Sequence, residues 1–133
     1  MSTTDVVSAL RQAATGLTYP SETDAPWTAF AWPDATGTPT GPEVRRRGRH
    51  KPAARVQEQS VDELFAPLVQ EQSWYGDAEK ADAAKNRALR DVIDRTLMNA
   101  RVFRVGDRKL SVYVVGQVKD GGWAGLVTTA IET

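Results

Sequence analysis

The feature that most constrains the fold is a run of three β-rich segments at the end of the chain. They are Arg101–Val105, Lys109–Val118 and Trp123–Glu132, and turns containing Gly106-Asp107 and Lys119-Asp120-Gly121-Gly122 separate them. Glycine- and aspartate-rich turns between β-branched, aromatic-rich runs are the strongest short-range signal for hairpins. The sequence therefore predicts three antiparallel strands joined as an up-and-down meander.

The third of these segments is apolar on both sides of the predicted strand: Trp123, Val127 and Ile131 alternate with Ala124, Leu126 and Ala130. A strand of this kind is usually covered on both faces of its sheet. It also brings Glu132 and the α-carboxylate of Thr133 to one edge of the sheet, where a rigid element can present anionic groups to a partner. The simpler alternative is that the chain ends where the fold ends.

Three helices are predicted before the meander. Asp5–Ala14 carries one apolar stripe, Ser60 and Glu63 form a capping box for a helix to about Gln72, and the longest helix runs from Asp77 to about Asn99. The aromatic segment Trp27–Trp32 is typical of a strand, which can join the meander in either direction. We predict an α/β fold, namely a three-layer α/β/α sandwich around a small mixed sheet, with the first helix and the helix pair at 60–99 as the outer layers.

Composition excludes several classes of function. The chain has 133 residues, the length of one domain, and we expect a single domain over residues 1–133. Lysine plus arginine equal aspartate plus glutamate at 17 each, so no net charge favours nucleic acid or anionic membranes. The lack of cysteine excludes disulfides and thiol chemistry. With no signal peptide and no apolar run of membrane-spanning length, we expect a cytoplasmic monomer.

Residues 34–59 differ in composition from the rest of the chain. A turn-rich stretch, DATGTPTGP, leads into EVRRRGRHKPAAR, which has five arginines and one lysine against one glutamate. We expect a flexible basic loop with two possible roles: Arg45–Arg55 binds nucleic acid or another partner, or it is a solvated surface loop. No aromatic residue lies between these cations, which argues against direct nucleic-acid binding by base stacking. His50 is the single histidine and has no sequence neighbour that would make it a metal ligand or catalytic base.

Two other segments carry candidate binding residues. Glu22 and Asp24 lie in a proline-bounded loop, where they either face a partner together or cap the amides of their own loop. Trp74 lies in the short connection QSWYGD, where it is either a lid on the core or an exposed anchor at an interface. The chain has no phosphate-binding glycine loop, no dinucleotide fingerprint and no zinc-ligand spacing. These observations favour a binding protein without a cofactor over an enzyme.

Four stretches of the chain carry a resemblance: GLTYPSETDAPWTAFAW at Gly16–Trp32, QSWYGD at Gln72–Asp77, VYVVGQVKDGGWAGLVTT at Val112–Thr129, and AIET at Ala130–Thr133. Together they resemble the nuclease A inhibitor family, small proteins that block sugar-non-specific, metal-dependent DNA/RNA endonucleases. The resemblance spans nearly the whole chain and implies an α/β/α sandwich like that of pathogenesis-related proteins. The basic segment Arg45–Arg55 has no counterpart in it.

The resemblance also implies how such a protein acts. The family's C-terminal threonine is a ligand of the magnesium in the nuclease active site, and it corresponds to Thr133. Magnesium prefers oxygen ligands, so a presented carboxylate or hydroxyl can replace one of its waters. The family's loop glutamate pairs with a nuclease arginine and corresponds to Glu22. Trp74 corresponds to an interface tryptophan, and we expect Asp24 and Glu132, beside these groups, to contact the nuclease too.

Overall fold

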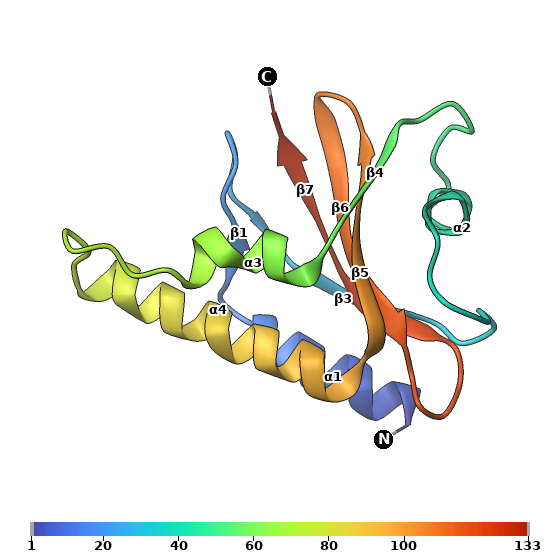
Figure 1. The fold of residues 1–133 in the computed structure, drawn as a ribbon, viewed down its shortest axis with the longest axis horizontal. Coiled ribbons are helices and arrows are strands. Elements are labelled where there is room, and N and C mark those ends of the chain that lie inside the picture. Colours follow the sequence, from blue (N-terminus) through green and yellow to red (C-terminus); the bar gives the residue numbers. More distant parts are fainter. Residues whose placement is uncertain (1, 133) are drawn as a thin grey trace.

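The computed structural model describes residues 2–132 as an antiparallel sheet with helices on both of its faces (Figure 1). The helices are α1 (Thr3–Ala14), α2 (Gly41–Arg47), α3 (Val61–Val69) and α4 (Asp77–Thr96). The strands are β1 (Thr18–Tyr19), β2 (Ala25–Pro26), β3 (Thr28–Trp32), β4 (Val56–Gln59), β5 (Met98–Gly106), β6 (Lys109–Gln117) and β7 (Trp123–Ile131).

The main sheet has the strand order β3-β7-β6-β5-β4, and each of its ladders is antiparallel. The predicted meander is confirmed as β5, β6 and β7. The sheet is not mixed as expected, because β3 joins β7 in the antiparallel sense with Trp32 opposite Trp123. This register places the two indole rings 6.3 Å apart between ring centroids, on one face of the sheet. Strands β1 and β2 form a separate two-stranded hairpin.

Both faces of the sheet are buried, as the two-sided pattern of the last strand predicted. Helices α1, α3 and α4 cover one face, where Leu10, Phe65, Leu89 and Leu126 are among the side chains of the larger core. Each such side chain that leaves water contributes about 1.5–3 kcal/mol to folding. The opposite face holds a smaller core that includes Trp123. The α/β class with helices on both faces is therefore confirmed.

The assignment of helices to layers was wrong, because α1 and the α3–α4 pair lie on the same face. The second layer is α2, within residues 34–59, which we had expected to be a loop. Proline at the start of α2 and Gly48 at its end define a short helix, and its one large apolar residue, Val44, is fully buried. Residues 56–59 form β4, the strand next to β5. A helix with one buried valine gives no apolar periodicity, so the sequence did not reveal it.

The helices that flank the candidate site begin with local hydrogen bonds. The capping box of α3 is confirmed: Ser60 Oγ accepts from the Glu63 N–H at 3.0 Å, and Glu63 Oε1 accepts from the Ser60 N–H at 3.1 Å. At α4, Glu79 Oε2 accepts from the Gly76 N–H at 3.1 Å. These contacts fix where the two helices start, and therefore where the connection between them lies relative to the hairpin.

Candidate functional site

The β1–β2 hairpin is joined to the end of β7 by a serine. Ser21 Oγ accepts from the Ile131 N–H at 3.2 Å and from the Thr23 N–H at 3.3 Å, and it donates to the Thr23 carbonyl at 2.6 Å. The Glu22 N–H donates to the Ile131 carbonyl at 3.3 Å. Further along β7, Thr128 Oγ1 donates to the Pro26 carbonyl at 2.9 Å. The tip of the hairpin is thus held beside the end of β7 (Figure 1).

A second set of contacts fixes Glu132. Its N–H donates to the Arg108 carbonyl at 2.8 Å, and its carboxylate pairs with the Arg104 guanidinium. Arg104 Nη1 also donates to the Tyr19 hydroxyl at 3.2 Å, so one arginine connects β5, the hairpin and the chain end. Burial opposes the charge of Arg104, but the Tyr19 hydrogen bond and the Glu132 carboxylate hold its pKa above the usual value.

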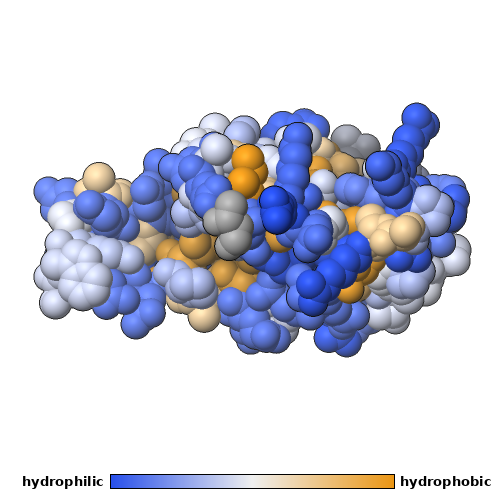
Figure 2. All heavy atoms as spheres, turned by 90° about the horizontal axis from the view of Figure 1, so that it is seen from above, coloured by the Kyte–Doolittle hydropathy of each residue, from blue (hydrophilic) through white to orange (hydrophobic). Residues whose placement is uncertain are grey.

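The structure brings the predicted residues Glu22, Asp24 and Glu132 to one end of the molecule. All three are exposed, and they lie on the hairpin loop and directly after β7. Seen from above, this end of the molecule is mainly hydrophilic, with narrow apolar strips between the polar side chains (Figure 2). Thr133, the predicted ligand of the partner's magnesium, lies outside the described residues.

Trp74 lies on the connection between α3 and α4, just before the first turn of α4. Figure 1 shows this connection at the left of the molecule, away from the end of β7. The side chain of Trp74 is 76% exposed and packs edge-on against Tyr75, with ring centroids 6.1 Å apart. Trp74 is therefore not a lid on the core, and its exposure is that of an available interface anchor.

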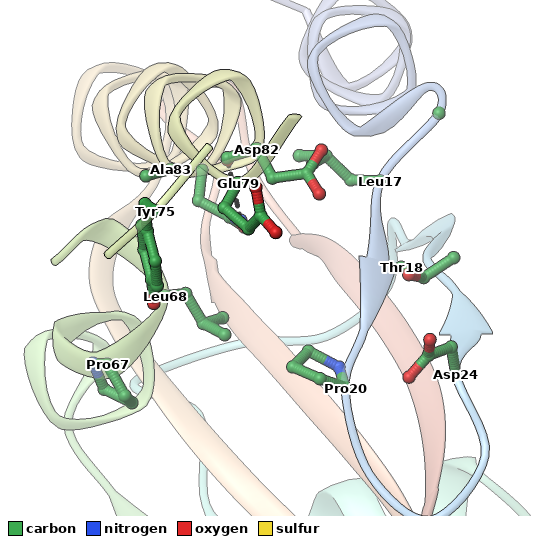
Figure 3. A pocket seen from close by; sticks show the side chains of 12 residues that line it. Leu17, Thr18, Pro20, Asp24, Pro67, Leu68, Tyr75, Glu79, Asp82 and Ala83 are labelled. Carbon is green, nitrogen blue, oxygen red and sulfur yellow. Dashed lines mark hydrogen bonds between the residues drawn. The ribbon is translucent and has the colours of Figure 1, made fainter. Parts of the chain in front are cut away.

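A cavity of about 300 Å³ lies between the hairpin and the α3–α4 connection (Figure 3). Asp24 and Pro20 line it from the hairpin side, and Tyr75, Glu79 and Asp82 line it from the other side. The cavity therefore connects the surface of the acidic loop with the surface that carries Trp74.

The arginines of α2 have partners inside the chain. Arg45 Nη1 donates to the Ala54 carbonyl at 3.1 Å, and Arg46 pairs with Glu43. Arg47 pairs with Asp34 at 2.9 Å and lies against the rings of Trp32 and Trp123, at 6.0 and 5.8 Å from their centroids. Its hydrogen bond to Asp34 raises the pKa of Arg47 and lowers that of the aspartate. This part of the predicted basic loop holds α2 against the sheet.

His50 also has a structural role. Its Nε2 lies 2.7 Å from the hydroxyl of Tyr113, a buried residue of β6. Burial lowers the pKa of His50 and raises that of Tyr113, which favours the neutral form of both. Within residues 2–132, no group of three or more histidine, aspartate and glutamate side chains is arranged to hold a metal ion.

Sequence reasoning missed the two residues that hold the site together, Ser21 and Arg104. Serine is a common turn residue in a proline-bounded loop, so the sequence pattern does not single out Ser21. Arg104 stands in a strand segment, Arg101–Val105, where an arginine with a side chain only 14% exposed is unusual. The one signal for Arg104 in the sequence is a charged residue between the apolar residues Phe103 and Val105, which are both buried.

The end of β7 and the hairpin loop, which hydrogen bonds join, thus present exposed carboxylates on one surface. Residues 4–133 match the family described as nuclease A inhibitor-like protein, and the chain belongs to that family. Membership indicates a nuclease-inhibitor role with a nuclease as partner. No curated protein matches the chain. None of the described helices is long and apolar enough to cross a membrane.

Proposed function

We propose that this protein inhibits a metal-dependent, sugar-non-specific DNA/RNA endonuclease by placing its C-terminal end in the active site. Two hydrogen bonds carry the proposal. The Ile131 N–H donates to Ser21 Oγ, and the Glu22 N–H donates to the Ile131 carbonyl. They join the acidic loop to the last strand, so that the loop and the chain end approach a partner as one rigid surface.

The proposed chemistry is competition for magnesium and for phosphate-binding residues. Thr133 supplies an oxygen ligand to the nuclease's magnesium, which needs only one or two protein oxygens and keeps several waters. Glu22 pairs with an arginine that serves the phosphate in the nuclease, and such a pair is strong once water is excluded. Because neither group offers a bond that the nuclease can cleave, the site stays occupied.

The other candidate residues have supporting roles. Asp24 adds negative charge to the loop, which favours approach to a nucleic-acid-binding cleft. Trp74 anchors a second, more distant area of the nuclease. Glu132 acts mainly through Arg104, because that ion pair orients the chain next to Thr133. The nuclease is the only macromolecule this proposal requires.

The test is an inhibition titration with protein that ends at Thr133 and carries no C-terminal tag. A magnesium-dependent, non-specific nuclease should be blocked at equal molar amounts. Removal of Thr133, or two glycines added after it, should raise the inhibition constant at least a hundredfold, because a metal ligand is lost or displaced. Equal inhibition by the extended protein would refute the metal-ligand mechanism.

A charge variant tests the loop separately. Glu22→Gln should raise the inhibition constant by more than about thirtyfold, since it leaves a nuclease arginine unpaired in the interface. Glu58→Gln on β4, three strands away from β7 in the sheet, is the matched control and should change it less than about twofold. If the two variants behave alike, Glu22 has no specific partner.

A further inference from the structure

The end of the sheet that carries the acidic loop also carries exposed cations. The loop between α2 and β4 and the turn between β5 and β6 both lie at this end, beside the end of β7 (Figure 1). Backbone hydrogen bonds join these segments: the Gly106 N–H donates to the Arg55 carbonyl at 2.9 Å, and the Glu132 N–H donates to the Arg108 carbonyl at 2.8 Å. The exposed cations of the loop and the turn form a basic patch: Arg49, Lys51, Arg55, Arg108 and Lys109. The fold therefore assembles this patch from segments that are distant in sequence.

The charges of the basic patch are not neutralised by the rest of the chain. None of its five side chains forms an ion pair within residues 2–132. In this they differ from Arg45, Arg46 and Arg47, whose guanidinium groups have partners inside the chain. Asp107, which is exposed in the same turn, offsets one of the charges. Like charges held on one surface repel each other, and the field they create attracts an anionic ligand.

Arg49 has a backbone conformation that favours glycine. Its φ is 59°, in the left-handed region, directly after Gly48, the C-cap of α2. The Arg49 N–H donates to the Arg46 carbonyl and the His50 N–H to the Arg45 carbonyl, both at 3.1 Å, which is the helix ending that usually has glycine at this position. A side chain here costs stability. The charged group of Arg49 has no ion pair within residues 2–132 that would offset this cost, so its charge is free for a ligand.

The surroundings of the basic patch indicate which kind of anion it fits. Apart from the cations, the exposed residues of the loop and the turn are Pro52, Ala53 and Asp107. The large apolar side chains that are exposed in the described chain, Trp74 and Met98, lie before α4 and at the start of β5. Protein interfaces have aromatic or aliphatic anchors at their centre, whereas surfaces that bind nucleic acid are polar and strongly positive. The patch has the second character.

We propose that the basic patch binds the sugar-phosphate backbone of DNA or RNA without reading the bases. Guanidinium and ammonium groups pair with phosphate oxygens, which every nucleotide presents, and the patch has no exposed aromatic ring on which a base could stack. Affinity should lie in the range of non-specific binding, about 10⁻⁴–10⁻⁶ M at physiological salt. This site is separate from the proposed inhibition of a nuclease, and it holds the protein on the polymer that such a nuclease cleaves.

The first test is fluorescence anisotropy with a labelled DNA single strand in buffer without magnesium. The logarithm of the binding constant should fall with the logarithm of the salt concentration with a slope of about −3, since five cations release at most about 0.7 counterions each. Strands of thymine alone and of adenine alone should bind with similar affinity. Absence of binding at about 0.05 M salt and about 1 mM protein would overturn the proposal, because non-specific binding is tighter than this.

A matched pair of lysines tests the location of the site. Lys109 and Lys119 are both exposed and lie at opposite ends of β6, and only Lys109 belongs to the basic patch. Lys109→Ala should weaken DNA binding about fivefold at about 0.05 M salt and make the salt slope shallower by about 0.7, because one phosphate contact is lost. Lys119→Ala should leave both quantities near wild type. Equal effects of the two substitutions would place the binding elsewhere and overturn the proposal.

Arg49→Gly separates a role in binding from a role in the fold. Glycine relieves the left-handed backbone, so the melting temperature of the free protein should rise by about 3 °C. DNA binding should nevertheless weaken about fivefold, because a phosphate contact is lost. A fall in both stability and DNA binding would make Arg49 a structural residue. Unchanged DNA binding would remove it from the site, and either result contradicts the reasoning above.

The same substitutions distinguish nucleic acid from an acidic surface of a protein partner. If Lys109→Ala and Arg49→Gly weaken inhibition of a nuclease but leave DNA binding unchanged, the basic patch contacts the nuclease and the nucleic-acid proposal is wrong. If they weaken DNA binding while Glu22→Gln does not, the proposal is supported. The outcome is independent of the proposed function, because DNA binding is measured without a nuclease and stands even if wild-type protein inhibits none.

Discussion

The hydroxyl of Ser21 makes a sharp prediction, because one small group holds the hairpin loop to the last strand. Ser21→Ala removes the 2.6 Å bond to the Thr23 carbonyl and the longer bonds from the N–H groups of Thr23 and Ile131. A net contribution of about 1 kcal/mol for the short bond and about 0.5 kcal/mol for each long one gives a loss of about 2 kcal/mol in the free energy of unfolding. The melting temperature should fall by about 5–8 °C.

The same substitution should weaken inhibition. Without the hydroxyl, the Ile131 N–H loses its acceptor, and the loop that carries Glu22 loses one of the contacts that hold it to β7. Because a tenfold change corresponds to about 1.4 kcal/mol, a loss of that order in pre-organisation raises the inhibition constant about tenfold.

Urea unfolding followed by tryptophan fluorescence and an inhibition titration, run on the same samples, measure both effects. Ser8→Ala, at an exposed position of α1, is the control and should leave both quantities close to wild type. The reasoning is refuted if Ser21→Ala keeps the wild-type urea midpoint. If the midpoint falls but inhibition is unchanged, the serine stabilises the fold without organising the site.

Three further predictions concern the contacts around the site and the second face of the sheet. A double-mutant cycle of Arg104→Met and Glu132→Gln should give a coupling free energy of about 1 kcal/mol in urea unfolding; a value near zero would remove Glu132 from the network. Burial lowers the pKa of His50 below 6.5, so the unfolded chain takes up the proton at higher pH than the folded protein does. The free energy of unfolding should therefore fall as pH drops below 6.5. His50→Gln should reduce that fall, which melting temperatures measured over a range of pH would show. Arg47→Lys should cost about 1–2 kcal/mol in urea unfolding, because lysine cannot stack on two tryptophans while pairing with carboxylates.

Strand periodicity and turn chemistry predicted the central part of the fold. The meander, its turns and the burial of both faces of β7 follow from alternation of apolar residues and from glycine-rich turns, which are local properties of the chain. The helices α1, α3 and α4 follow from apolar stripes at three- and four-residue spacing. The residues of these elements carry their own conformational preference, so no tertiary contact is needed to recognise them.

Local patterns failed where a contact distant in sequence determines the conformation. Helix α2 exists because Val44 is buried on the sheet and Arg47 lies on two tryptophans, and neither partner is near it in the sequence. The candidate residues Glu22, Asp24 and Trp74 were found by composition and resemblance, but the cavity that Asp24 lines together with Tyr75 and α4 was not.

The sequence alone determined the meander, the helices α1, α3 and α4, and which residues at the acidic loop and the chain end carry charge. Tertiary structure decided that α1, α3 and α4 share one face, that Ser21 and Arg104 fix the loop to the last strand, and that two carboxylates of α4 line one cavity with Asp24. The physical reason is that charge and periodicity are encoded residue by residue. The meeting of two surfaces depends on how helices pack on a sheet, and many sequences with the same local pattern pack differently.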